Sequence, residues 1–253
     1  SYNFWRCHTA DSSPQQTGWY PSLDMDGDDL PHIAHYDYTD GDLEYTYWDG
    51  TMWHPVTVDS AGDVGKRPSL QVSGTEVYVS YFDNTNDCLK YAHRAWGVWT
   101  PETVECGTYV GQYSSLALDS LGRPHIAYGG PNGASLRHAW YDGSWQIETI
   151  DTVPYVGYIA LAIDAHDHPA IAYYVSPPGH LQVARYVAIG GNCGPQEKWR
   201  CDLVEEGLYV GTEAAIALDE LGRPCVSYQD NANGDLRYAE WYYAAVLPLV
   251  EKR

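Results

Sequence analysis

Aromatic rings and small polar side chains recur together along this chain, in a pattern that suits carbohydrate recognition. A Tyr-Val-Gly phrase occurs three times, and short acidic loops follow apolar runs at similar intervals. Flat rings beside oxygen acceptors match sugar rings and hydroxyls, and they also match peptides. The predicted ligand-binding residues are Trp19, Tyr20, Tyr109, Tyr155 and Tyr209, with Asp37, Asp83 and Asp230. The alternative is structural, since each aromatic could pack between repeats and each loop could form a hairpin turn.

The loop Asp24–Asp29 reads DMDGDD and has the acidic spacing of calcium loops. Asp24, Asp26 and Asp28 are the predicted ligands, and calcium is the one cofactor considered. No glutamate follows at the distance that completes a helix-loop-helix calcium site. The alternative is an acidic version of a turn that other repeats build differently.

Signatures of catalysis are weak. The chain has no HExxH, CxxC or GxSxG motif, so zinc-protease, zinc-ribbon and esterase chemistry lack support. A glycosidase needs two carboxylates about 5–9 Å apart, but most acidic residues here recur from repeat to repeat. The recurrent set is Asp26, Asp119, Asp164 and Asp219. Carboxylates that recur in this way are typical of turns, where they accept backbone hydrogen bonds.

The histidines give no firm metal site. His32 and His125 occupy equivalent places in different repeats, and His166 and His168 lie two apart in one turn. Spacing fixes no third ligand for either pair. We therefore expect these residues to be structural or solvated, and the protein not to be an enzyme.

Composition excludes several partners. The 253 residues include 34 acidic and 14 basic side chains, for a net charge of −20. This balance argues against nucleic acid and against an anionic membrane surface. The chain contains no apolar stretch of about 18 residues, which is the length needed to span a bilayer. The chain has 23 Tyr and 10 Trp but only 2 Phe and 2 Met. This indicates surfaces that are partly exposed to solvent and form hydrogen bonds.

A repeat of about 46 residues sets the fold. Its opening glycines are Gly18, Gly65, Gly111, Gly157 and Gly211, spaced 47, 46, 46 and 54 residues apart. Each copy holds four short runs rich in Val, Ile, Tyr and Trp, separated by turn residues, which predicts four antiparallel strands. Five such copies predict an all-β, five-bladed β-propeller. A β-solenoid is the alternative, but its repeats are shorter and its strands are parallel.

We expect one domain over 1–253. Its blades cover about 12–59, 60–105, 106–151, 152–205 and 206–241, followed by a tail at 242–253. The last blade lacks the Trp-led fourth run, and WRCHTAD from Trp5 resembles WRCDLVE from Trp199. Residues 2–11 are therefore predicted to close the ring as the outer strand of blade five. The segment VLPLVE from Val246 is the rival.

Cysteine positions predict two disulfides. Cys88 and Cys106 flank a hairpin that places them opposite each other, within bonding reach. Cys193 and Cys201 could close the loop inserted in blade four. Cys7 and Cys225 would be separated by an intervening strand, at about 9–10 Å, so we expect both to be buried free thiols.

The phrases SLALDSLGRPHIAY (Ser115 to Tyr128), GDLRYAEW and DGSWQIETID resemble repeats of bacterial secreted propeller proteins. The chain is also similar to tachylectin-type lectins, in blade number and repeat length only. The resemblance implies an extracellular or cell-surface module. We expect it to bind glycans; the alternatives are a docking subunit for a surface protein and, third, a hydrolase or lyase. Several similar pockets would indicate a lectin, an extended apolar patch a docking subunit, and one asymmetric charged pocket at the channel mouth an enzyme.

Overall fold

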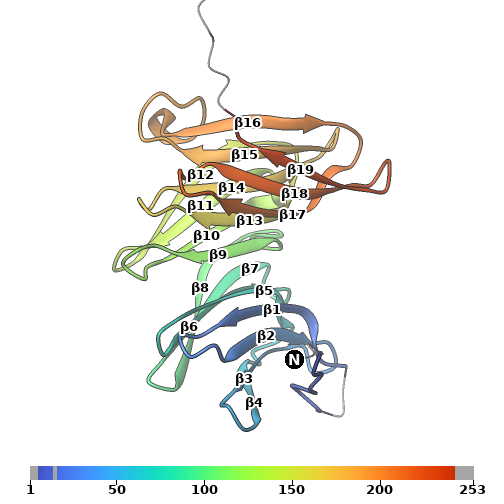
Figure 1. Ribbon diagram of the computed structural model, residues 1–253, viewed down its shortest axis with the longest axis vertical. Helices are drawn as coiled ribbons and strands as arrows, with labels where there is room; N and C mark the ends of the chain where they lie inside the picture. The colour runs from blue at the N-terminus through green and yellow to red at the C-terminus, as the bar shows by residue number, and fades with distance from the viewer. Residues whose placement is uncertain (1–4, 14–15, 243–253) are drawn as a thin grey trace, which may run out of the picture.

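The computed structural model describes residues 5–13 and 16–242, and their strands form five separate sheets. Figure 1 shows the sheets following one another from the blue sheet of blade one to the orange and red sheets of blades four and five. Each sheet is an antiparallel meander. The five-bladed β-propeller predicted from the repeats is confirmed. Four blades have four strands, and blade five has three in the described part of the chain.

The element bounds follow the predicted repeats. Blade one has β1 (Trp19–Met25), β2 (Pro31–Asp37), β3 (Asp42–Trp48) and β4 (Trp53–Asp59). Blade two has β5 (Val64–Ser73), β6 (Glu76–Asp83), β7 (Cys88–Ala95) and β8 (Val98–Cys106). Blade three has β9 (Ser114–Leu118), β10 (Pro124–Gly129), the 3-10 turn η1 (Pro131–Gly133), β11 (Ser135–Tyr141) and β12 (Trp145–Thr152). Blade four has β13 (Val156–Ile163), β14 (Pro169–Val175), β15 (His180–Tyr186), η2 (Pro195–Glu197) and β16 (Trp199–Glu206). Blade five has β17 (Val210–Leu218), β18 (Pro224–Asp230) and β19 (Asp235–Glu240).

Carboxylates at the ends of outer strands join each blade to the next. In four junctions a tyrosine hydroxyl on the second strand of the following blade donates to this carboxylate. The pairs are Tyr81–Asp59 at 2.7 Å, Tyr128–Glu105 at 2.6 Å, Tyr173–Asp151 at 2.8 Å, and Tyr228–Glu205. Lys90, Arg137 and Arg237 add a cation to three of the carboxylates. The acidic residue that ends each Trp-led run therefore holds two blades together.

The inner strands are joined by serines. The backbone N–H of Leu70 donates to the Ser22 hydroxyl oxygen at 2.9 Å, and that of Leu116 donates to Ser69 at 3.0 Å. Blades three and four repeat the contact through Ser115. The recurring glycine permits this close stacking, because a Cβ on Gly111 would lie 2.6 Å from the Cβ of Leu89 in the previous blade.

The described N-terminal residues do not complete blade five. Residues 5–13 contain no strand and lie against blade one, where Thr46 donates to the Ala10 carbonyl at 3.2 Å. The structure therefore does not confirm closure by residues 2–11. Residues 2–4 of that prediction, and the rival segment from Val246, lie outside the described residues.

Both predicted disulfides are confirmed. Cys88–Cys106 links β7 to β8, and Cys193–Cys201 closes the loop before β16. Cys7 and Cys225 are free thiols. The expectation that both are buried is wrong, because Cys7 is exposed and Cys225 is only partly buried. Among the described residues no helix has the length and apolar character needed to cross a membrane.

The blade junctions make a stability prediction. Tyr81→Phe removes the hydroxyl that donates to Asp59 and leaves a buried carboxylate short of one hydrogen bond. We expect the free energy of unfolding to fall by about 1–3 kcal/mol, measured by urea denaturation. Tyr38→Phe is the control, because this tyrosine is exposed and packs by its ring on Trp19. Equal losses in both variants would contradict the role of the junction.

The first blade makes a pH prediction. Burial and the nearby Asp11 raise the pKa of Glu44 from 4.5 to about 7. Because the folded state holds this proton more tightly than the unfolded chain, stability is lost as pH rises from 4.5 through 7. Glu44→Gln should therefore raise the melting temperature at pH 8 and change it little at pH 4, by thermal unfolding followed at both. Glu220→Gln in an exposed turn is the control, and a gain for Glu44→Gln that is independent of pH would refute the assignment.

Candidate functional site

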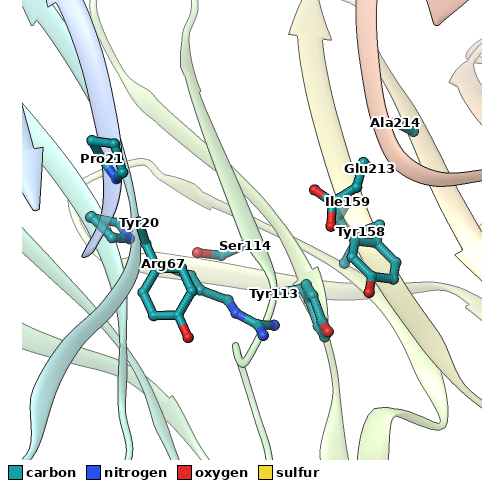
Figure 2. A pocket seen from close by; sticks show the side chains of 10 residues that line it. Tyr20, Pro21, Arg67, Tyr113, Ser114, Tyr158, Ile159, Glu213 and Ala214 are labelled. Atoms are coloured by element: carbon teal, nitrogen blue, oxygen red, sulfur yellow. The ribbon is translucent and has the colours of Figure 1, made fainter. Parts of the chain in front are cut away.

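One residue at the start of each inner strand points toward the centre of the arc of blades. These five residues, and the residue that follows each of them in the sequence, line a cavity of about 360 Å³. The pointing residues are Tyr20, Arg67, Tyr113, Tyr158 and Glu213, and the successors are Pro21, Pro68, Ser114, Ile159 and Ala214. Figure 2 shows Tyr20 and Arg67 on the left, Tyr113 near the middle, and Tyr158 and Glu213 together on the right. We call this cavity the channel mouth.

A bulge in the inner strand aims four of these five side chains. Tyr20, Arg67, Tyr158 and Glu213 have φ values of 52°, 52°, 47° and 50°, in the left-handed region. The pairing register of their strands shifts at the same points. A bulge re-aims a side chain and is common beside active sites. Left-handed backbone in residues other than glycine is strained, and such strain gathers where function requires it.

Arg67 is the cation of the channel mouth. Its guanidinium lies 4.1 Å from the Tyr113 ring centre and 5.4 Å from that of Tyr20. Its Nη1 is buried with no hydrogen-bond partner. Arg137 and Arg237 each form an ion pair with a carboxylate, whereas Arg67 forms none within the described residues. In a chain of charge −20, an unpaired arginine in a cavity is suited to an anionic ligand, since guanidinium binds carboxylates through two parallel hydrogen bonds.

Tyrosine hydroxyls surround this cation. The rings of Tyr113 and Tyr158 lie 5.0 Å apart. Burial and the neighbouring Tyr113 raise the pKa of Tyr158, so its hydroxyl keeps its proton at neutral pH. Tyr155 lies behind them, and burial raises its pKa to about 12. The mouth therefore offers the protonated hydroxyl of Tyr158 close to a fixed positive charge.

The channel mouth is not symmetric. The five equivalent positions hold three tyrosines, one arginine and one glutamate. Glu213 is the single carboxylate among the described residues that line it. This matches the pattern that we expect of an enzyme, in which one charged pocket at the channel mouth breaks the repeat.

The predicted aromatic ligand-binding residues lie in different places in the structure. Tyr20 lines the channel mouth, whereas Trp19 beside it stacks on Tyr38 at 5.1 Å. Tyr109 and Tyr209 are more than half exposed and lie outside the lining. Tyr155 packs on Gly133, where a Cβ would lie 2.7 Å from the ring.

The predicted carboxylates serve turns. Asp37, Asp83 and Asp230 are buried, and each accepts two backbone N–H groups of its own hairpin. These contacts are those of hairpin turns, which is the alternative that the sequence left open for these loops.

The proposed calcium ligands are also engaged by the backbone. Asp26 accepts hydrogen bonds from the N–H groups of Asp28 and Leu30, and Asp24 accepts one from Val72 of blade two. Among the described residues no cluster of three or more acidic, histidine or cysteine side chains is arranged to hold a metal. Calcium binding at Asp24, Asp26 and Asp28 stays a prediction.

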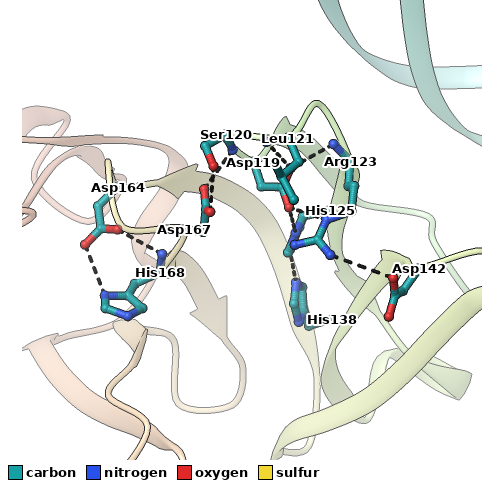
Figure 3. A network of polar contacts seen from close by, with 10 residues as sticks. All are labelled: Asp119, Ser120, Leu121, Arg123, His125, His138, Asp142, Asp164, Asp167 and His168. Atoms are coloured by element: carbon teal, nitrogen blue, oxygen red, sulfur yellow. Dashed lines mark hydrogen bonds and ion pairs between the residues drawn. The ribbon is translucent and has the colours of Figure 1, made fainter.

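Figure 3 shows the turns at the other end of the inner strands. Asp119 accepts from the backbone of Leu121 and Arg123, and Asp164 does the same for His166 and His168. The recurrent aspartates are therefore turn formers, as predicted. His125 contacts His138 at 3.0 Å, and burial lowers the pKa of His125 to about 4. His125 is therefore neutral at neutral pH, and its contact with His138 is structural.

Sequence reasoning missed four of the five pointing residues: Arg67, Tyr113, Tyr158 and Glu213. A signal for them exists in the repeat. They stand two places before the residue that aligns with Ser22 in each copy, and their type changes from blade to blade. A position that varies within a regular repeat, at the centre of the ring, was the available clue.

Comparison with known proteins gives the fold. No family model and no curated protein matches this sequence. A protein of unknown function from Dyadobacter fermentans is 11% identical, covers 89% of this chain and 79% of its own, and has a TM-score of 0.63. An ulvan lyase of a new polysaccharide lyase family, bound to -[GlcA(1-4)Rha3S]-, is 9% identical over 90% of this chain and 71% of its own, with a TM-score of 0.59. An alpha-L-arabinofuranosidase from Lactobacillus brevis is 10% identical over 89% and 91%, with a TM-score of 0.51.

These findings correct the functional expectation. The prediction of a glycan-binding module without catalysis is wrong, because the solved propellers that resemble this chain include glycoside hydrolases and a polysaccharide lyase. The asymmetric, charged channel mouth agrees with them. At identities near 10% the likeness itself shows the fold, a β-propeller of the kind that such enzymes use.

Proposed function

We propose that the protein is a carbohydrate-active enzyme that cleaves a uronate-containing polysaccharide by β-elimination. The observation that carries this proposal is the unpaired Arg67, held among tyrosine hydroxyls at the channel mouth. A uronate carboxylate is the anionic group that a polysaccharide would bring to this cation. The ulvan lyase of similar fold was solved with a glucuronate-containing oligosaccharide, which supports the choice of substrate class.

The lining favours elimination over hydrolysis. A glycosidase places two carboxylates on either side of the scissile bond, but the described lining has one, Glu213. Elimination requires a cation that neutralises the uronate carboxylate, a base and an acid. Arg67 and the tyrosines supply groups of these kinds without a second carboxylate.

The roles follow from position. Arg67 binds the uronate carboxylate and stabilises the negative charge that develops when the adjacent C5 loses its proton. Tyr113 accepts this proton as a tyrosinate, after its own hydroxyl proton has been lost to solvent, and its ring lies against the guanidinium that holds the carboxylate next to C5. The C5–H electrons form the C4=C5 double bond, and the C4–O bond breaks. Tyr158 gives its proton to the leaving oxygen, since its raised pKa keeps the hydroxyl protonated.

Two disulfides fit an oxidising compartment. We therefore place the enzyme outside the cytoplasm, where polysaccharides are its substrates. The glycan partner remains in this proposal, as a substrate.

Activity is tested with a panel of polyuronates and neutral polysaccharides. We expect new reducing ends from a polyuronate, together with the ultraviolet absorbance of an unsaturated uronate. Arg67→Met should reduce kcat/KM by about 10²-fold or more, whereas Arg200→Met, on the outer strand of blade four, should not. Reducing ends without absorbance would identify hydrolysis, and inertness of the folded protein toward every uronate would overturn the proposal.

Proton transfer is tested at the tyrosines. Tyr113→Phe and Tyr158→Phe each remove one hydroxyl and leave the rings in place. Each should lower kcat by about 10²–10⁴-fold with a small change in KM. Tyr109→Phe is the matched control, because this tyrosine is exposed outside the lining. Unchanged kcat in either pocket variant would remove that residue from the mechanism.

A further inference from the structure

Blade five has an apolar face that every other blade buries. Four blades pack an equivalent leucine of the third strand against the next blade, and each is fully buried: Leu43, Leu89, Leu136 and Leu181. The fifth copy, Leu236, is 85% exposed. Tyr238, which corresponds to the fully buried Tyr45, is 62% exposed. This face has the composition of a blade junction and no partner among the described residues.

Blade one has the complementary face. In blades two to four the inner-strand leucines Leu70, Leu116 and Leu161 are buried against the preceding blade. Their equivalent in blade one, Leu23, is 61% exposed, and Met25 beside it on the same side of β1 is also exposed. Blade one, at the bottom of Figure 1, and blade five, near its top, therefore each expose a face that the other blades bury against a neighbour.

The N-terminal segment already occupies part of this junction. Asp11 aligns with Asp59, the carboxylate that ends an outer strand. Its carboxylate lies 3.6 Å from His35, and His35 aligns with Tyr81, the partner of Asp59. Asp11 thus meets blade one as an outer-strand carboxylate meets the following blade. Trp5, by contrast, is 97% exposed, whereas its counterpart Trp199 is fully buried.

We infer that the chain closes its ring by docking the exposed face of blade five on the exposed face of blade one. Residues Trp5–Asp11 add to the free edge of β19 as the fourth strand of blade five. Trp5 and Leu236 are then buried as their counterparts are. Closure brings Tyr20 and Glu213, which belong to the two end blades, to neighbouring places around the channel mouth.

The register of the missing strand can be derived from blade four. There Leu181 pairs with Glu205 and Ala184 pairs with Cys201. Translated to blade five, Leu236 faces Asp11 and Ala239 faces Cys7. Blade two has a disulfide in such a cross-strand position, between the paired residues Cys88 and Cys106.

A cysteine at position 239 tests the closure. In a Cys225→Ser background, Ala239→Cys should form a disulfide with the native Cys7 under mild oxidation. Non-reducing mass spectrometry should find a monomer in which the peptides of residues 7 and 239 are linked. A disulfide-linked dimer would show that a second copy fills the junction, and absence of a link would show that the edge stays open. Either outcome overturns the inference.

Two controls accompany the cross-link. Adding Cys7→Ser should abolish it and leave the melting temperature unchanged under reducing conditions. Hydrogen exchange of the unsubstituted chain gives an independent measurement. Closure should protect the backbone amides of β19 that point to its free edge, just as pairing with β16 protects the corresponding amides of β15. Rapid exchange at all of these amides would contradict closure. Neither readout uses catalysis, so the outcome is separate from that of the proposed function.

Discussion

The carboxylate at the end of each outer strand is the contact on which this propeller depends. It accepts a hydrogen bond from the hydroxyl of a buried tyrosine in the next blade. In three junctions a lysine or arginine of the next blade also pairs with its negative charge. A buried carboxylate is costly unless it is hydrogen-bonded and paired. Each junction therefore specifies which strand end meets which neighbour, and apolar packing around it supplies most of the stabilisation. The junction at blade one departs from this rule, because His35 and Glu44 replace the tyrosine and the cation.

A regular scaffold leaves the centre free to vary. Serines and glycines fix how the inner strands stack, and in four blades a bulge turns one residue of the inner strand toward the axis. The bulged position is exempt from the packing demands of the junction. Five equivalent positions can thus hold three kinds of side chain, and where the backbone is left-handed its strain is carried by contacts elsewhere. This is how a repeat protein can build one asymmetric site.

Propellers of similar fold include glycoside hydrolases and a polysaccharide lyase, so the fold serves several reactions. Function has to be argued from the residues at the mouth. In the described part of this chain the mouth holds an arginine without a carboxylate partner and a group of tyrosines, and the proposed anion binding and proton transfer rest on these residues. The chain has 34 acidic residues and 14 basic ones. An arginine that has no carboxylate partner among the described residues despite this excess is therefore unusual.

The sequence by itself determined the blade count, the strands, the aspartate turns and both disulfides, because these depend on local periodicity and short spacings. It also showed that the fifth copy lacks a strand. Only the tertiary structure decided which residues converge: Arg67 and Glu213 are 146 positions apart along the chain, yet both line one cavity. The bulges that aim them come from register shifts between paired strands, which no single strand encodes. The recurrent Tyr-Val-Gly phrase drew the site prediction to repeated positions, whereas the channel mouth is lined by positions at which the repeat changes.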